Sequence, residues 1–79
     1  MKVTDSVKAE LTLLYPTARI LINDNDEHYK FYCIDKSNDK IIYGRIGRKP
    51  RVEPMRNYNN DEYVEQKIKE KLNKGYKEI

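Results

Sequence analysis

Three short apolar segments, separated by polar turn residues, set the strongest limit on how this chain can fold. Residues 18–23, 29–35 and 40–46 are rich in β-branched and aromatic side chains, which is typical of β-strands. The polar stretches at residues 23–26 and 36–39 hold Asn, Asp and Ser, whose short side chains hydrogen-bond the local backbone in turns. The pattern predicts consecutive antiparallel strands. In the second strand, alternation would place Tyr29, Phe31 and Cys33 on one face and Lys30, Tyr32 and Ile34 on the other.

A fourth strand is predicted over residues 51–58, and Pro54 restricts where it can lie. Proline has no N–H to donate to a neighbouring strand. We therefore expect this segment at an edge of the sheet or at a bulge.

The segment after residue 58 predicts a helix. Asn59 and Glu62 have the spacing of a capping box, in which each side chain bonds the other residue's backbone N–H. Gly75 suits the C-terminal cap because glycine readily adopts a left-handed conformation. The lysines of this segment alternate with acids and are interpreted as a solvated face. A narrow apolar stripe toward one partner surface is expected from Val64, Ile68 and Leu72.

Residues 1–17 fit two structures. Pro16 would end a helix whose apolar positions are Val3, Val7, Leu11 and Leu14. Residues 11–15 also fit a strand, and we favour the helix. We expect a single small α+β domain over residues 1–79, with residues 1–17 as an N-terminal extension and 18–79 as the core. The core would be an antiparallel sheet of about four strands with the C-terminal helix packed on it.

Burial can be predicted for the apolar side chains of these elements. Four tyrosines are expected to be half-buried packing residues, Tyr29, Tyr32, Tyr58 and Tyr76. Cys33 is expected to be an inert buried thiol, because a reactive thiolate needs a basic and partly exposed setting. The core itself is expected to contain Phe31, Ile42, Val64, Ile68 and Leu72.

Composition limits the class of protein. A chain of 79 residues has too few side chains for two cores, and 37% of them are charged, against about 25% in a typical domain. The longest apolar run, residues 31–34, is far shorter than the roughly 20 residues of a membrane span. No secretory signal pattern is present at the N-terminus. A single cysteine cannot form an internal disulfide, so a reducing, cytoplasmic location is expected.

Positive charge is concentrated in the middle of the chain. The net charge is +3, but residues 40–56 hold six basic side chains and one acid, whereas residues 1–39 are net acidic and residues 57–79 are neutral. This block contains every arginine except Arg19. Arginine binds phosphate through a planar two-pronged guanidinium, so the block suggests a nucleic-acid backbone contact. A solvated surface is the competing interpretation.

Three sequence blocks resemble the WGR domain family. They are Lys-Phe-Tyr at residues 30–32, Tyr-Gly-Arg-Ile-Gly at 43–47, and Glu-Lys-Leu-Asn-Lys-Gly-Tyr at 70–76, in an order and spacing similar to the family's. The resemblance extends from about residue 18 to the C-terminus. It implies an antiparallel sheet with a packed helix and a contact with DNA, at which Tyr43 and Arg45 would lie and Gly44 would let the backbone approach closely.

The chain departs from the family pattern at two places. Tyr43 stands where the family name has tryptophan, which gives a smaller stacking face. Residues 47–51 lack the family's second glycine and its glutamine, and contain Arg48, Lys49 and Arg51 instead. No polymerase catalytic region accompanies the segment, so no ADP-ribosyl transfer is implied.

No arrangement of residues indicates catalysis or a metal site. His28 and Cys33 are five residues apart, which places them on opposite faces of a strand. His28 follows Asp24, Asp26 and Glu27, but Tyr29 occupies the position where a calcium loop needs glycine. No second histidine or cysteine completes a zinc set. We therefore expect a protein that is not an enzyme and that binds no metal or cofactor.

The leading hypothesis is a nucleic-acid-binding module, with DNA as the expected partner and no membrane contact. The alternative is a protein–protein adaptor whose basic surface binds an acidic partner. A third interpretation treats Tyr43 as an ordinary sheet aromatic and pairs Arg45 with an acid of the helix. The predicted binding residues are Tyr43, Gly44, Arg45, Arg48, Lys49, Arg51 and Arg56.

Overall fold

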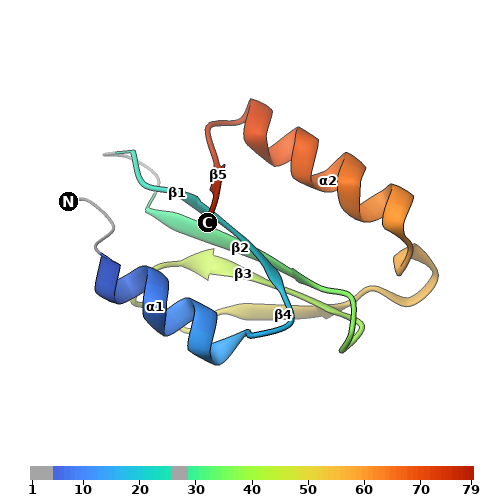
Figure 1. Cartoon of the computed structure of the whole chain (residues 1–79), viewed down its shortest axis with the longest axis horizontal. Helices are drawn as coiled ribbons and strands as arrows, with labels where there is room; N and C mark the ends of the chain where they lie inside the picture. Colours follow the sequence, from blue (N-terminus) through green and yellow to red (C-terminus); the bar gives the residue numbers. More distant parts are fainter. Residues whose placement is uncertain (1–4, 26–28) are drawn as a thin grey trace.

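The computed structural model describes residues 5–25 and 29–79, and it shows an α+β fold (Figure 1). The predicted strands and the C-terminal helix are present. The elements in chain order are α1 (Asp5–Leu14), β1 (Arg19–Asn23), β2 (Lys30–Asp35), β3 (Lys40–Arg45), β4 (Arg51–Pro54), a 3₁₀ turn η1 (Arg56–Tyr58), α2 (Asp61–Asn73) and β5 (Lys77–Glu78).

The five strands form one antiparallel sheet in the order β4-β3-β2-β1-β5. Consecutive strands from β1 to β4 pair as neighbours, as expected for strands joined by short turns. The two-residue β5 was not predicted, and it pairs with β1 on the far edge. β4 lies at the opposite edge, which confirms the position expected from Pro54.

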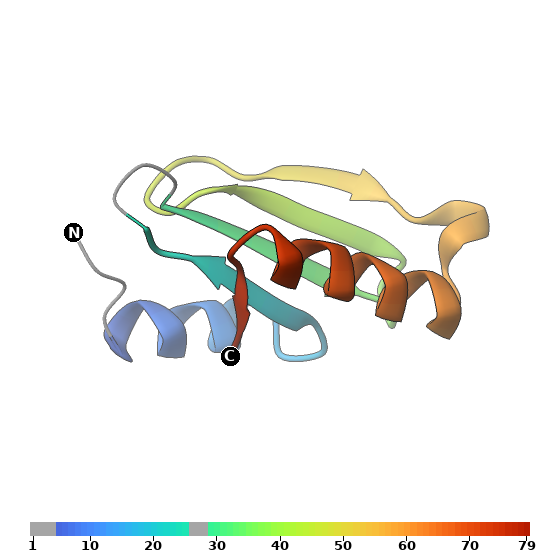
Figure 2. The ribbon, with the colours of Figure 1, turned by 90° about the horizontal axis from the view of Figure 1, so that it is seen from above.

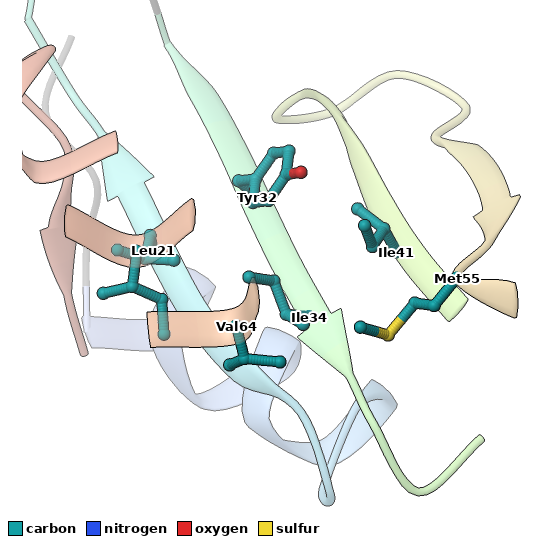
Figure 3. Close-up of a cluster of buried hydrophobic side chains, with 7 residues drawn as sticks. Leu21, Tyr32, Ile34, Ile41, Met55 and Val64 are labelled. Carbon is teal, nitrogen blue, oxygen red and sulfur yellow. The ribbon is translucent and has the colours of Figure 1, made fainter. Parts of the chain in front are cut away.

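Each face of the sheet is covered by one helix, and Figures 1 and 2 show α1 and α2 on opposite sides. Alternation along β2 is confirmed, because Phe31 and Cys33 pack with Leu11 of α1, whereas Tyr32 and Ile34 pack on the α2 side. Figure 3 shows part of the α2-side cluster. Its buried members are Leu21, Tyr32, Ile34, Ile41, Met55, Val64 and Ile68.

The favoured helix in the N-terminal segment is confirmed over Asp5–Leu14. Leu11 is buried and Val7 is half-buried, as the spacing of the apolar residues predicted. Leu14 is 60% exposed, whereas Tyr15, four residues after Leu11, packs against the cluster on the α1 side. Val3 lies outside the described residues.

The start of α2 differs from the prediction by one residue. The N-cap is Asn60, whose side-chain oxygen accepts a hydrogen bond from the Tyr63 N–H at 2.8 Å. Asn59 instead donates to the Lys36 carbonyl at 3.0 Å and to Asp39 at 2.9 Å. The capping box predicted for Asn59 and Glu62 was therefore wrong, because Asn59 is used to join the helix entry to the β2–β3 turn.

The end of α2 confirms the role expected of Gly75. Its φ is +97°, and its N–H donates to the Leu72 carbonyl while the Tyr76 N–H donates to the Lys71 carbonyl. This pair of bonds is a Schellman motif, which reverses the chain direction after a helix. The reversal brings Tyr76 back toward the sheet, where it is half-buried.

Three burial predictions were wrong. Tyr32, expected to be half-buried, is only 7% exposed, because it lies on the central strand β2 and packs in the α2-side cluster. Helix geometry explains the second. Leu72 is 46% exposed. Four residues make slightly more than one helical turn, so each step from Val64 to Ile68 to Leu72 moves the side chain about 40° around the helix and away from the sheet. Lys71, seven residues after Val64, returns almost to the same side and occupies the position predicted for Leu72.

Tyr58 is 61% exposed rather than half-buried, because β4 ends at Pro54 and residues 56–58 form η1 instead of strand. The other core predictions are confirmed for Phe31, Ile42, Val64 and Ile68.

The β2–β3 turn is organised around the buried carboxylate of Asp35. Thr17 donates to it at 2.8 Å, and Asn38 donates through both its backbone N–H and its side-chain amide at 3.2 and 2.8 Å. Burial alone would raise the pKa of Asp35, but these hydrogen bonds hold it below its ordinary value. The charged carboxylate therefore contributes to the stability of the fold.

We expect this contribution to be lost in acid. Because the pKa of Asp35 is lower in the folded than in the unfolded chain, its stabilisation is present above about pH 4 and disappears as the pH falls through the folded-state pKa. Asp35→Asn should lower the free energy of unfolding by about 2 kcal/mol at neutral pH and flatten its acid dependence. Urea unfolding followed by circular dichroism between neutral and acid pH measures both effects. Parallel pH curves for the two proteins would contradict this role.

Candidate nucleic-acid interface

The α2 side of the sheet contains an open groove of about 540 Å³ at the end of β3. α2 covers the sheet around Leu21 and Ile34 but leaves the Tyr43 end of β3 open, and the β3–β4 loop forms the opposite wall. We call this cavity the basic groove. Its lining residues are Lys30, Phe31, Tyr32, Tyr43, Gly44, Arg45, Arg48, Lys49, Arg51, Lys71 and Tyr76.

Strand register explains why cations and rings gather there. Arg45 of β3 lies directly opposite Lys30 of β2, and Tyr43 lies opposite both Tyr32 of β2 and Arg51 of β4. Residues two apart on a strand share a face, so all five side chains emerge on the α2 side. Cross-strand partners are about 5 Å apart, which makes a compact patch of three cations and two phenol rings.

The β3–β4 loop depends on Gly44. Its φ of +154° lies outside the range that other residues readily adopt, and a Cβ there would lie 3.5 Å from the Pro50 Cα. The loop folds tightly, with the Arg48 N–H donating to the Arg45 carbonyl at 3.2 Å. This turn holds Arg48 and Lys49 beside the end of β3, on the wall of the basic groove.

Tyr43 is half-buried, with its ring at 6.0 Å from the ring of Tyr32. Its hydroxyl donates to Glu53 at 2.8 Å, and this hydrogen bond raises the pKa of the phenol. The bond fixes the orientation of the ring. Tyr43 is thus both a sheet aromatic and a wall of the groove.

Among the described residues, Arg45, Arg48 and Lys49 of the groove have no acidic partner. Within residues 5–25 and 29–79, no carboxylate lies at ion-pair distance from Arg45, Arg48 or Lys49. All three side chains are exposed. The pairing of Arg45 with a helix acid, considered above, is therefore not seen in the described part of the chain.

Lys71 is the central cation that the sequence did not reveal. Its ammonium lies 4.5 Å from the centre of the Tyr32 ring and 5.5 Å from that of Tyr76, both within cation–π range. Burial lowers the pKa of Lys71, and repulsion from Lys74 and Lys67 lowers it further. Lys71 therefore lies among like charges, and a bound anion would reduce the repulsion between them.

Six of the seven predicted binding residues line the basic groove, and Arg56 does not. Arg56 follows the far end of β4, in η1, so the basic block of the sequence is divided between two ends of that strand. The groove adds Lys30, Lys71, Tyr32, Tyr76 and Phe31 to the predicted set. The sequence offered one signal for Lys71, because it lies seven residues after Val64 and therefore on the same side of the helix, facing the sheet.

A second cavity, of about 410 Å³, opens on the α1 side and has a different chemistry. It is lined mainly by apolar side chains, among them Leu11, Leu14, Phe31 and Ile46. Of these two cavities, the basic groove is the one that combines several cations with aromatic rings.

The remaining site predictions concern catalysis and metals. The Cys33 thiol is fully buried, and burial raises its pKa to about 12, which confirms the expectation of an inert thiol. Among the residues that the structure describes, no group of three or more His, Cys, Asp or Glu side chains could hold a metal ion. Asp26, Glu27 and His28 lie outside those residues. No described helix is long and apolar enough to cross a bilayer.

Comparisons of the chain with protein-family models, with curated proteins and with solved structures found no match. The resemblance to WGR domains stays a prediction. The geometry of the basic groove is therefore the basis for a functional assignment.

Replacing Gly44 tests the loop that forms one wall of this groove. Gly44→Ala should reduce the free energy of unfolding by about 1 to 3 kcal/mol, because alanine is strained at this backbone conformation. Chemical unfolding of the two proteins provides the measurement. A change within about 0.5 kcal/mol, as at an ordinary surface position, would show that glycine is not required.

The environment of Lys71 predicts an abnormal titration. Its ammonium should deprotonate below the ordinary lysine pKa of about 10.4, as followed by NMR of the side-chain ¹³Cε and ¹⁵Nζ nuclei. Glu70 partly offsets the repulsion, so Glu70→Gln should lower the pKa of Lys71 further. An ordinary value in the wild type, or a rise in the variant, would be inconsistent with the like charges around Lys71.

Proposed function

We propose that the protein is a non-enzymatic nucleic-acid-binding module that holds the phosphate backbone in the basic groove. The single observation behind this proposal is the lining of that groove, in which six side chains are cationic and none of the described ones is acidic. Polyanions bind to such a surface by releasing condensed counterions, which gives an affinity that depends on salt.

The aromatic side chains favour nucleic acid over an acidic protein. Tyr43 and Tyr76 are half-buried on the groove, and Tyr32 lies beneath Lys71. Phenol rings can stack on bases or sugars, which an acidic peptide does not offer. DNA is the proposed partner, and binding to an acidic protein is the competing outcome of the test below.

We also propose a cytoplasmic location. The support is the fully buried thiol of Cys33, which cannot reach a second cysteine on another molecule without unfolding.

Charge reversal in the groove should weaken DNA binding strongly. The wild type should bind short fluorescent DNA with a dissociation constant below a millimolar at low salt, and Arg45→Glu and Arg48→Glu should each lose most of this affinity. Fluorescence anisotropy with duplex, single-stranded and nicked DNA over a salt series measures both the affinity and its salt slope.

Arg56→Glu is the matched control, because it makes the same charge change outside the basic groove. It should retain most of the affinity. No binding by the wild type at low salt would defeat the proposal. A protein partner captured from a lysate after nuclease treatment, together with no DNA binding, would favour the adaptor.

A further inference from the structure

The basic groove continues beyond the residues near Tyr43. A smaller cavity of about 330 Å³ adjoins it, and the two share Lys30, Lys71 and Tyr76. The smaller cavity adds Asn23 of β1 and Lys74 at the C-cap of α2. The Asn23 amide donates to the Lys74 carbonyl at 3.3 Å, which ties this end of the helix to the sheet. The two cavities together form one continuous path.

This path crosses the strands rather than following them. Arg51 lies on β4, Arg45 on β3 and Lys30 on β2, and Asn23 of β1 is the direct partner of Lys30. Three spacings between neighbouring strands amount to about 14 Å. Each of the strands β4, β3 and β2 contributes a cation, and Lys74 supplies one at the β1 end.

Two partly exposed rings accompany these cations. Tyr43 lies toward the β4 side of the path, and Tyr76 lies on the other side of Lys71. A base can stack on such a ring only when its face is free, as in a single strand or at an end. In the interior of a duplex, base faces are covered by neighbouring base pairs.

The depth of Lys71 also favours a narrow ligand. Its ammonium lies over Tyr32, which is only 7% exposed, so it belongs to the floor of the path. Lys71 is itself half-buried, and a phosphate can reach it through the two cavities that it lines. Arg48 and Lys49 on the loop are exposed and accessible to a ligand of any width.

We propose that this path binds an extended single-stranded nucleic acid in preference to a duplex. The strand crosses from β4 toward β1, with its phosphates at Arg45, Lys71 and Lys74 and unpaired bases against Tyr43 and Tyr76. This assignment rests on the proposed nucleic-acid binding and specifies its substrate. It also gives the helix lysines Lys71 and Lys74 a role in binding.

The test compares labelled oligothymidylates of increasing length with a blunt hairpin duplex by anisotropy at low salt. The single strands should bind at least about tenfold more tightly than the hairpin, with an affinity that levels off near four nucleotides, the low end for small binding folds. Lys71→Gln and Tyr43→Leu should each weaken single-strand binding about tenfold. Their effect on the hairpin should be much smaller.

Two matched variants control for general loss of charge or of an exposed ring. Lys69→Gln removes a charge from an exposed position of α2, and Tyr58→Leu removes an exposed phenol outside the path. Both should bind like the wild type, and circular dichroism confirms that every variant is folded.

The outcomes separate this inference from the proposed function. Equal or tighter binding to the hairpin would overturn the single-strand assignment while leaving nucleic-acid binding intact. Tight single-strand binding that is unchanged in both Lys71→Gln and Tyr43→Leu would overturn the path. Absence of binding to either ligand would overturn both proposals.

Discussion

The pairing of β2 with β3 is the constraint on which the rest of the molecule depends. β2 is the central strand, and its side chains are buried on both faces, so a shift of one residue would exchange two packed clusters. The same register that buries Ile34 opposite Ile41 places Lys30 opposite Arg45 and Tyr32 opposite Tyr43. One end of this pairing therefore builds a core, and the other end builds a charged surface.

The charges of the protein fall into two kinds. The first kind forms ion pairs that join elements of the fold. Arg19 donates to Glu78 at 2.8 Å and also pairs with Glu65, which joins β1, β5 and α2. Lys36 pairs with Asp61 at the start of α2. In the basic groove, by contrast, cations lie close together within the described structure without carboxylate partners for Arg45, Arg48 and Lys49. Like charges held together oppose folding. Burial lowers the pKa of Lys71 most, and repulsion from Lys74 and Lys67 adds a further cost. A bound polyanion would remove it.

Local patterns predicted most of the fold, because turns and alternation are encoded by neighbouring residues. The strands, the helix in the N-terminal segment and the role of Gly75 could be predicted in this way. β5 could not, since two residues carry no periodic signal and the strand exists only through its pairing with β1. The cap at Asn60 was missed because the choice between two adjacent asparagines is made by a tertiary bond from Asn59 to Asp39.

The candidate site shows the same division between local and tertiary information. Tyr43 through Arg51 are close in sequence, so their clustering was expected. Lys30 and Lys71 enter the groove through strand pairing and helix packing, which a charge count along the chain does not detect. Arg56 belongs to the same basic block but lies beyond the other end of β4, because a strand separates residues that are near in sequence.

The most direct test of the binding surface is a titration of the ¹⁵N-labelled protein with a short oligonucleotide, followed by backbone amide chemical shifts. We expect the largest shifts at Lys30, Gly44, Arg45, Lys71 and Tyr76, while the amides of α1 and η1 remain nearly unchanged. Shifts concentrated on α1 or around Arg56, with the groove residues unaffected, would contradict binding in the basic groove.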